Sequence, residues 1–210
     1  IDQLEGGSPE YNMPGALRIK GDFDVAAAEQ AIIRIIERHE ALRTVFAEEE
    51  DGPVQVIREE FDFKLHRCDL SAYTPEEQGE RVRALIQEES LKVFDLSADL
   101  MVRGAYFSLS PEGGTQEGVL LFNMHHIASD GLSIGILMQE FVAQYQSILE
   151  GSSDPLPPLT ISYADYSYWQ RQNLSGEILS QNGRCTTHTQ KVVNYYYFIL
   201  ILNYYFILNY

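Results

Sequence analysis

Two adjacent histidines with a nearby aspartate are the side chains of this sequence best suited to chemistry. His125 and His126 are followed by Asp130 and Gly131. A neutral imidazole can take a proton from an amine or thiol that attacks an acyl group. Asp130 can hold the loop by bonding a backbone group or an arginine, and Gly131 allows a close backbone approach or an unusual dihedral angle. The spacing therefore supplies a proton acceptor, a carboxylate that can hold the loop in place, and a backbone position with unusual conformational freedom.

This loop joins a predicted strand to a predicted helix. Residues 119–124 are apolar and partly β-branched or aromatic, which is typical of a strand buried on both faces. Beyond the loop, apolar residues recur at helical spacing up to residue 149, so we expect a helix capped by Asp130 or Ser129. Because neighbouring strand residues point to opposite faces, only one of the two histidines can face a given cavity.

The rest of the chain predicts further strands and helices around this loop. A helix is expected after Asp24, and its apolar stripe includes His39, which we interpret as a packed, hydrogen-bonded core histidine. The other expected elements are extended residues 12–23, a hairpin of 44–47 with 54–57, a strand at 61–65, a helix over 75–94 capped at Thr74, a strand at 100–109 that turns over 111–118 into the histidine-bearing strand, and a helix over 163–174.

Composition narrows the class of protein. With 210 residues the chain is long enough for one domain or a piece of a larger one. Its net charge of -16 disfavours a nucleic-acid partner, because phosphate neutralisation needs clustered Lys and Arg. Residues 195–210 are too short and too interrupted by Asn for a membrane span. Two cysteines without metal or redox spacing fit a reducing compartment, so we expect a cytoplasmic protein.

Three motifs together resemble the condensation domains of nonribosomal peptide synthetases, which are relatives of chloramphenicol acetyltransferase. His125-His126-x-x-x-Asp130-Gly131 is similar to their signature, and a shorter His-x-x-x-Asp-Gly version occurs across the acyltransferase superfamily. Residues 38–46 (RHEALRTVF) resemble the second core motif of the family, and residues 163–169 (YADYSYW) resemble the fourth. The three motifs occur in the order of the family, and the resemblance covers roughly residues 3–180.

The resemblance implies an α/β fold, an α+β two-layer sandwich of the chloramphenicol acetyltransferase-like type, with a mixed sheet packed by helices. It assigns residues 1–181 to the N-terminal lobe of a condensation domain, which is incomplete without the second lobe that forms the opposite wall of the active site. From Asn182 the resemblance stops, and residues 182–210 are a low-complexity tail rich in Asn, Tyr, Phe, Ile and Leu. We interpret this tail as non-native or disordered, and as the product of a shifted reading frame.

The resemblance also implies a reaction. Condensation domains join two acyl groups that are held as thioesters on the phosphopantetheine arms of carrier domains, and they bind no cofactor or metal directly. The implied partners are donor and acceptor peptidyl carrier domains and an adjacent adenylation domain, without nucleic acid or membrane. Residues 11–14 resemble the subtype that accepts an L-configured donor. We expect the parent synthetase to form peptide bonds and this chain alone to be inactive or nearly so.

Carried over residue by residue, the resemblance places His126 at the chemistry, either as general base or as a group that orients the attacking amine. His125 and Asp130 would be structural, and Gly131 would place its backbone N–H near the reacting carbonyl. The family pairs the aspartate with an arginine. That arginine can belong to the missing lobe, so Arg43, Arg38 and Arg18 are local candidates only.

Three alternative functions stay open. An epimerisation domain shares the histidine motif, but residues 38–46 and 163–169 favour condensation. A remnant that only docks carrier domains would keep the same fold without catalysis. A metal site of His125, His126 and Asp130 is disfavoured because adjacent strand residues diverge. A heterocyclising relative would replace the histidine pair with aspartate.

Overall fold

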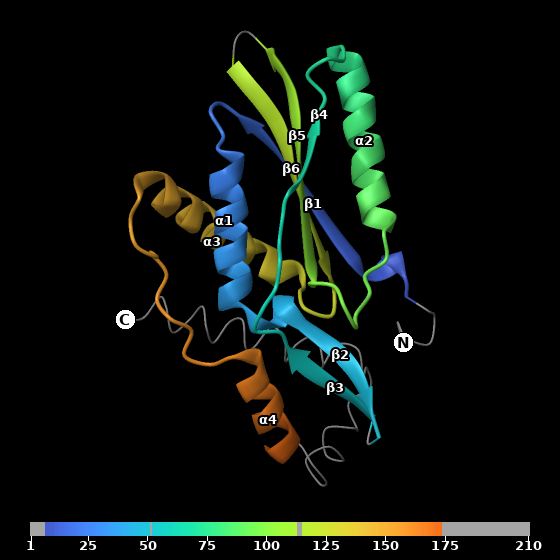
Figure 1. Ribbon diagram of the computed structural model, residues 1–210, viewed down its shortest axis with the longest axis vertical. Helices are drawn as coiled ribbons and strands as arrows, with labels where there is room; N and C mark the ends of the chain where they lie inside the picture. Colours follow the sequence, from blue (N-terminus) through green and yellow to red (C-terminus); the bar gives the residue numbers. More distant parts are fainter. Residues whose placement is uncertain (1–6, 51, 113–114, 174–210) are drawn as a thin grey trace.

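A computed structural model describes residues 7–50, 52–112 and 115–173 of the protein (Figure 1). The tail predicted at residues 182–210 lies outside the described residues. Four strands form one sheet in the order β1-β6-β5-β4. Within it β6 (Thr115–His125) pairs antiparallel with both β1 (Asn12–Lys20) and β5 (Val102–Glu112), while β4 (His66–Asp69) runs parallel to β5. The sheet is therefore mixed, as predicted.

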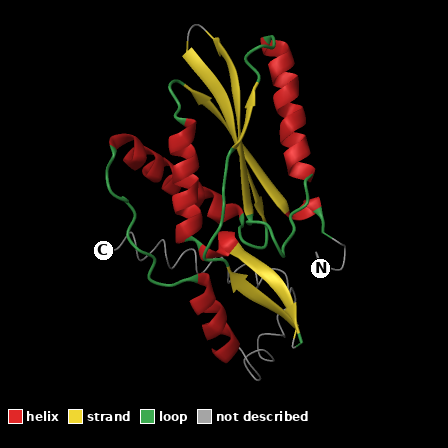
Figure 2. Ribbon diagram, in the orientation of Figure 1, coloured by secondary structure: helices red, strands yellow, loops and turns green. Residues whose placement is uncertain are grey.

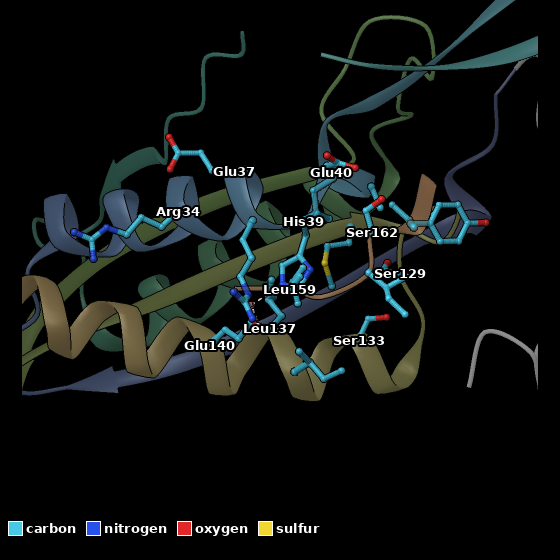
Figure 3. A pocket seen from close by; sticks show the side chains of 18 of the residues that line it. Arg34, Glu37, His39, Glu40, Ser129, Ser133, Leu137, Glu140, Leu159 and Ser162 are labelled. Atoms are coloured by element: carbon cyan, nitrogen blue, oxygen red, sulfur yellow. Dashed lines mark hydrogen bonds and ion pairs between the residues drawn. The ribbon is translucent and has the colours of Figure 1, made fainter. Parts of the chain in front are cut away.

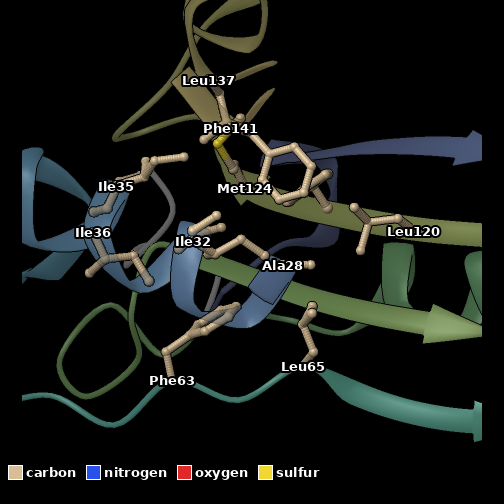
Figure 4. Close-up of a cluster of buried hydrophobic side chains, with 14 residues drawn as sticks. Ala28, Ile32, Ile35, Ile36, Phe63, Leu65, Leu120, Met124, Leu137 and Phe141 are labelled. Carbon is tan, nitrogen blue, oxygen red and sulfur yellow. The ribbon is translucent and has the colours of Figure 1, made fainter. Parts of the chain in front are cut away.

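Helices cover both faces of this sheet (Figures 1 and 2). The helices α1 (Val25–Arg38) and α3 (Gly131–Glu150) pack against one face, and α2 (Pro75–Leu91) packs against the other. Alternate side chains of β6 serve the two cores, with Leu120, Phe122 and Met124 in the larger cluster beneath α1 and α3 (Figure 4) and Val119 and Leu121 beneath α2. The predicted mixed sheet packed by helices is confirmed, and α2 adds a layer that the two-layer expectation did not include.

The remaining elements lie around this core. The strands β2 (Thr44–Glu49) and β3 (Gly52–Ile57) form a separate antiparallel hairpin, as predicted. The helix α4 (Tyr163–Asn173) follows a Pro-rich connection, and the 3-10 turns η2 (Pro9–Tyr11) and η3 (Glu40–Arg43) precede β1 and β2. Across the described ranges, no helix combines the length and apolar character needed to cross a membrane.

Capping residues explain where the helices start and stop. The Asp24 carboxylate accepts hydrogen bonds from the first free N–H groups of α1, at 2.8 and 3.0 Å. Thr74 and Glu77 form a reciprocal capping box at the start of α2, with Pro75 in the first turn. At the end of α3, Gly151 has φ of 64°, a left-handed conformation that glycine adopts without steric cost. The predicted caps at Asp24 and Thr74 are confirmed.

The predicted end of α2 is wrong. The helix was expected to reach residue 94, but it ends at Leu91. The guanidinium of Arg103 donates hydrogen bonds to the carbonyl oxygens of Lys92 and Val93, at 2.8 and 2.6 Å, and so satisfies them outside a helix. Phe94 turns away from the stripe of α2 and is buried against the His125 ring.

The strand predicted at residues 61–65 is also wrong. Phe63 and Leu65 are buried without strand pairing, and the pairing to β5 begins only at His66. Leu65 fills the space beside Gly104, where an added Cβ would lie 2.6 Å from Cδ2 of Leu65. The turn expected over residues 111–118 is shorter than predicted, because β5 continues to Glu112 and β6 resumes at Thr115.

Gly118 on β6 gives a test of this packing. A Cβ added there would overlap the hydroxyl end of Tyr106, whose ring is stacked on Phe23. We expect Gly118→Ala to lower the free energy of unfolding by about 1–3 kcal/mol, because the ring must shift. Gly135, inside α3, meets nothing within 4 Å, and Gly135→Ala should raise stability by about 0.5–1 kcal/mol. Urea denaturation of both variants measures the two values, and equal effects would contradict the close contact.

Candidate active site

His125 is the last residue of β6 and is held inside the protein. Its side chain is buried, at 3% exposure, with the rings of Tyr11 and Phe94 packed at centroid distances of 5.9 and 5.6 Å. Its Nδ1 accepts a hydrogen bond of 3.0 Å from the N–H of Ile127. The buried ring of His125 therefore holds the start of the loop through the N–H of Ile127, and its structural role in the reaction stays a prediction.

His126 points the other way and is exposed. Its backbone N–H donates to the carbonyl oxygen of Tyr11 at 2.8 Å, which ties the loop to the start of β1. The ring Nδ1 lies 2.8 Å from the carbonyl oxygen of Ser129. Because a carbonyl oxygen only accepts, Nδ1 carries the hydrogen, and in the neutral ring Nε2 keeps its lone pair. The two histidines thus diverge, and Nε2 of His126 is the nitrogen able to accept a proton.

Asp130 begins α3 as its N-cap. Its Oδ1 accepts hydrogen bonds from the N–H of Leu132 at 3.1 Å and from the N–H of Ser133 at 2.8 Å, so the predicted cap is confirmed. Within the described part of the chain its buried Oδ2 has no hydrogen-bond partner. Gly131 is the first residue of α3, so its N–H is one of those left without an intrahelical acceptor. Four other described glycines have a positive φ, but Gly131 does not. The prediction of an unusual dihedral angle at Gly131 is therefore wrong.

Arg43 does not reach this loop. Its guanidinium donates to the carbonyl oxygen of Arg58 at 2.7 Å and to that of Glu37 at 3.5 Å. No hydrogen bond or ion pair joins Arg43 to Asp130 among the residues that the structure describes. The structure therefore brings His125, His126, Asp130 and Gly131 together. Arg43 instead links η3 to Arg58, the residue that follows β3.

The other two arginine candidates pair with glutamates. Arg18 and Lys20 on β1 contact Glu117 of β6. On α1, Arg38 Nε lies 3.1 Å from Glu140 Oε1, and the neighbouring His39 lies 2.6 Å from Oε2 of the same carboxylate. His39 was predicted to be a packed, hydrogen-bonded core histidine. The hydrogen bond is confirmed, but the core position is wrong, because His39 is the half-buried C-cap of α1 and does not continue its apolar stripe.

Glu140 was missed by the motif reasoning. Burial disfavours ionisation of its carboxyl. The hydrogen bond from His39, the charge of that ring when it is protonated, and the charge and hydrogen bond of Arg38 outweigh burial and hold the pKa of Glu140 below its ordinary value of 4.5. A signal was present in the sequence, because Glu140 directly precedes Phe141 and follows Leu137 by three positions, so it falls on the apolar face of the expected helix. A charge on the buried face of a helix requires a partner.

The Glu140 cluster predicts acid sensitivity. Since the folded-state pKa is lower than the unfolded one, the unfolded chain binds more protons at low pH. The stabilisation by Glu140 is complete above its ordinary pKa of 4.5 and is lost as the pH falls through the lower folded value. Urea denaturation at pH 7 and at acid pH should show a smaller loss of stability for Glu140→Gln than for the unsubstituted chain. An identical pH dependence in the two proteins would contradict this assignment.

Comparison with known proteins gives one consistent result. A model of the family described as Condensation domain matches residues 1–182. A linear gramicidin synthase subunit of Brevibacillus parabrevis is 41% identical over 181 residues, which is 86% of this chain and 4% of that protein. Bacitracin synthase 3 of Bacillus licheniformis is 42% identical over 171 residues, which is 81% of this chain and 2% of that protein. The chain thus spans only a small part of the synthetases it matches.

Solved structures share the fold. The X-domain in its complex with OxyB from teicoplanin biosynthesis is 30% identical with a TM-score of 0.70, over 80% of this chain and 34% of that chain. The starter condensation domain of rhizomide synthetase is 21% identical with a TM-score of 0.73, over 83% of this chain and 41% of that chain. At this lower identity the second likeness concerns the fold alone.

Proposed function

Because the chain belongs to the condensation domain family of nonribosomal peptide synthetases, we propose that it contributes the catalytic loop of a domain that forms peptide bonds between carrier-bound thioesters. The observation that carries this proposal is the geometry of His126. Its ring is exposed at the end of β6, and its Nδ1 is engaged by Ser129, which leaves Nε2 as the proton acceptor.

The proposed reaction is an acyl transfer. The amine of the acceptor attacks the carbonyl carbon of the donor thioester, and Nε2 of His126 takes a proton from the attacking nitrogen. The tetrahedral intermediate then collapses and the C–S bond breaks. The leaving sulfur takes the proton held by Nε2 of His126 and departs as a thiol, which returns the ring to its neutral form. The N–H of Gly131 at the start of α3 is a candidate donor to the developing oxyanion, since a helix N-terminus favours negative charge. His125 and Asp130 act by holding the loop.

The partners belong to the same proposal. Donor and acceptor carrier domains present the substrates on phosphopantetheine arms, and an adenylation domain loads the acceptor carrier. Residues 1–181 supply one lobe, and the second lobe supplies the opposite wall of the active site. The arginine that pairs with Asp130 then comes from the second lobe, which would give its buried Oδ2 a partner. The isolated chain is expected to be inactive or nearly so.

A chimaeric domain tests the proposal. Residues 1–181 are fused to the stretch that follows the matching region of bacitracin synthase 3, and donor and acceptor carriers are loaded with aminoacyl groups. Intact-protein mass spectrometry should find the dipeptide on the acceptor carrier with the fusion and none with the 210-residue chain. A folded fusion that gives no amide, or one that only inverts the α-carbon of a single carrier-bound residue, would overturn condensation. Amide formation by the isolated chain would overturn the one-lobe assignment.

A further inference from the structure

A pocket of about 840 Å³ lies on the α1 and α3 side of the catalytic loop (Figure 3). Its lining comes from the end of α1, the first half of α3, residues 127–130 and the connection into α4. Pockets of about 300–1,000 Å³ are the size that holds small organic ligands. Leu42, Met124 and Leu137 give it an apolar floor. Residues 127–130 of the catalytic loop line this pocket, whereas His126 does not, so the pocket borders the loop without including the proposed base.

His39 lines this pocket beside Glu140 and has a defined tautomer. In Figure 3 its ring lies between α1 and α3, next to Leu137 and Glu140. The Glu140 carboxylate is held by Arg38 and can only accept, so the 2.6 Å contact requires that Nε2 of His39 carries the hydrogen. In the neutral ring Nδ1 then keeps a lone pair. No hydrogen bond of the described chain uses Nδ1, and the side chain is 28% exposed.

The charges around the pocket favour a cation. Of the two lining arginines, Arg38 is paired with the Glu140 carboxylate. Arg34 donates to the neutral side chain of Gln144 at 3.0 Å and keeps its positive charge. By contrast, Glu37 is exposed at the pocket and forms no ion pair within the described ranges. Asp165 also lines the pocket. Its carboxylate accepts the N–H of Ser162 at 2.9 Å, and its own backbone N–H donates to the hydroxyl of Ser162 at 3.1 Å. Among the described residues, four lining carboxylates therefore have no cationic partner, namely Glu37, Asp130, Asp154 and Asp165, so negative charge prevails at the pocket.

From this geometry we propose that the pocket binds a small organic cation, a primary ammonium group on an apolar body. The ammonium donates a hydrogen bond to Nδ1 of His39 and is attracted by Glu37 and Asp165, while the apolar body covers Leu42 and Leu137. Glu140 acts as a positioning residue, because it fixes the ring so that Nδ1 is the acceptor. The proposal does not depend on peptide bond formation.

Binding of 2-phenylethylammonium to the full 210-residue chain tests this proposal. At pH 8, calorimetry should show saturable binding, and NMR of the histidine ring nitrogens should show a shift of the Nδ1 resonance of His39. In His39→Gln the amide N–H can still donate to Glu140, but no acceptor occupies the position of Nδ1. Loss of one hydrogen bond to a charged group should weaken binding about tenfold or more. His66→Gln, an exposed histidine on β4 outside the pocket, is the matched control and should bind normally.

Two further measurements keep the proposal falsifiable. The neutral probe 2-phenylethanol has the same body without the cation and should bind at least about tenfold more weakly. Glu37→Gln changes an exposed residue only and should weaken binding of the cation several-fold, even if His39→Gln does not fold. The proposal is overturned by the absence of saturable binding at millimolar probe, by equal binding of the two probes, by unchanged binding in folded His39→Gln, or by unchanged binding in Glu37→Gln.

Discussion

His126→Ala in the chimaeric domain is expected to lower the rate of peptide bond formation by about 10²–10⁴-fold, the usual contribution of a general base. The Nδ1 bond to Ser129 directs the lone pair of the neutral ring to Nε2, and the exposed ring can reach a substrate. Alanine removes that acceptor without leaving a buried cavity. Single-turnover kinetics with loaded carriers would measure the loss in the chemical step.

The matched control is His66→Ala. His66 is also exposed, but it lies on β4 and is 60 positions before His126 in the sequence. Its rate should equal that of the unsubstituted domain. Carrier binding should be unchanged in His126→Ala, because a base at the chemistry contributes to the transition state and little to docking. A His126→Ala rate within a few-fold of the control would reject the base, and a parallel loss of carrier binding would indicate a docking role.

Most of the catalytic loop could be predicted because its causes are local. His125 is buried because it ends β6, which is buried on both faces, and His126 is exposed because the strand has ended. A carboxylate before a helical stretch determines the cap at Asp130. The contacts of Arg38 and His39 with Glu140 could not be predicted in this way. They join residues that are 102 and 101 positions apart, and they depend on which faces α1 and α3 turn toward each other.

The errors in the fold have the same origin. An apolar stretch such as residues 61–65 has one pattern whether it pairs as a strand or fills space, and here Leu65 fills the gap beside Gly104. The C-terminal end of α2 depends on Arg103 of β5, whose guanidinium donates hydrogen bonds to the carbonyl oxygens of Lys92 and Val93. Periodicity predicted the elements and local caps predicted the starts of the helices, but the end of α2 depends on a side chain of the following strand.

The second large effect concerns the attachment of α3 to the sheet. Phe141→Ala is expected to lower the free energy of unfolding by about 3–5 kcal/mol. The ring is 5% exposed, meets Phe122 of β6 edge-on at 5.4 Å and stacks with Tyr145 at 5.9 Å. Tyr145 stacks in turn on Phe23, so the lost ring leaves a cavity in a row of aromatic side chains that cannot easily collapse.

Val142 is the matched control, since it is adjacent on α3 but 51% exposed. Val142→Ala should change stability by no more than about 0.5 kcal/mol. Urea denaturation followed by far-UV circular dichroism compares the two variants. Domains of this size are stable by about 5–15 kcal/mol, so Phe141→Ala would leave α3 weakly held and with it the Asp130 cap that forms the end of the catalytic loop. Equal stabilities of the two variants would mean that α3 does not depend on this face for its attachment.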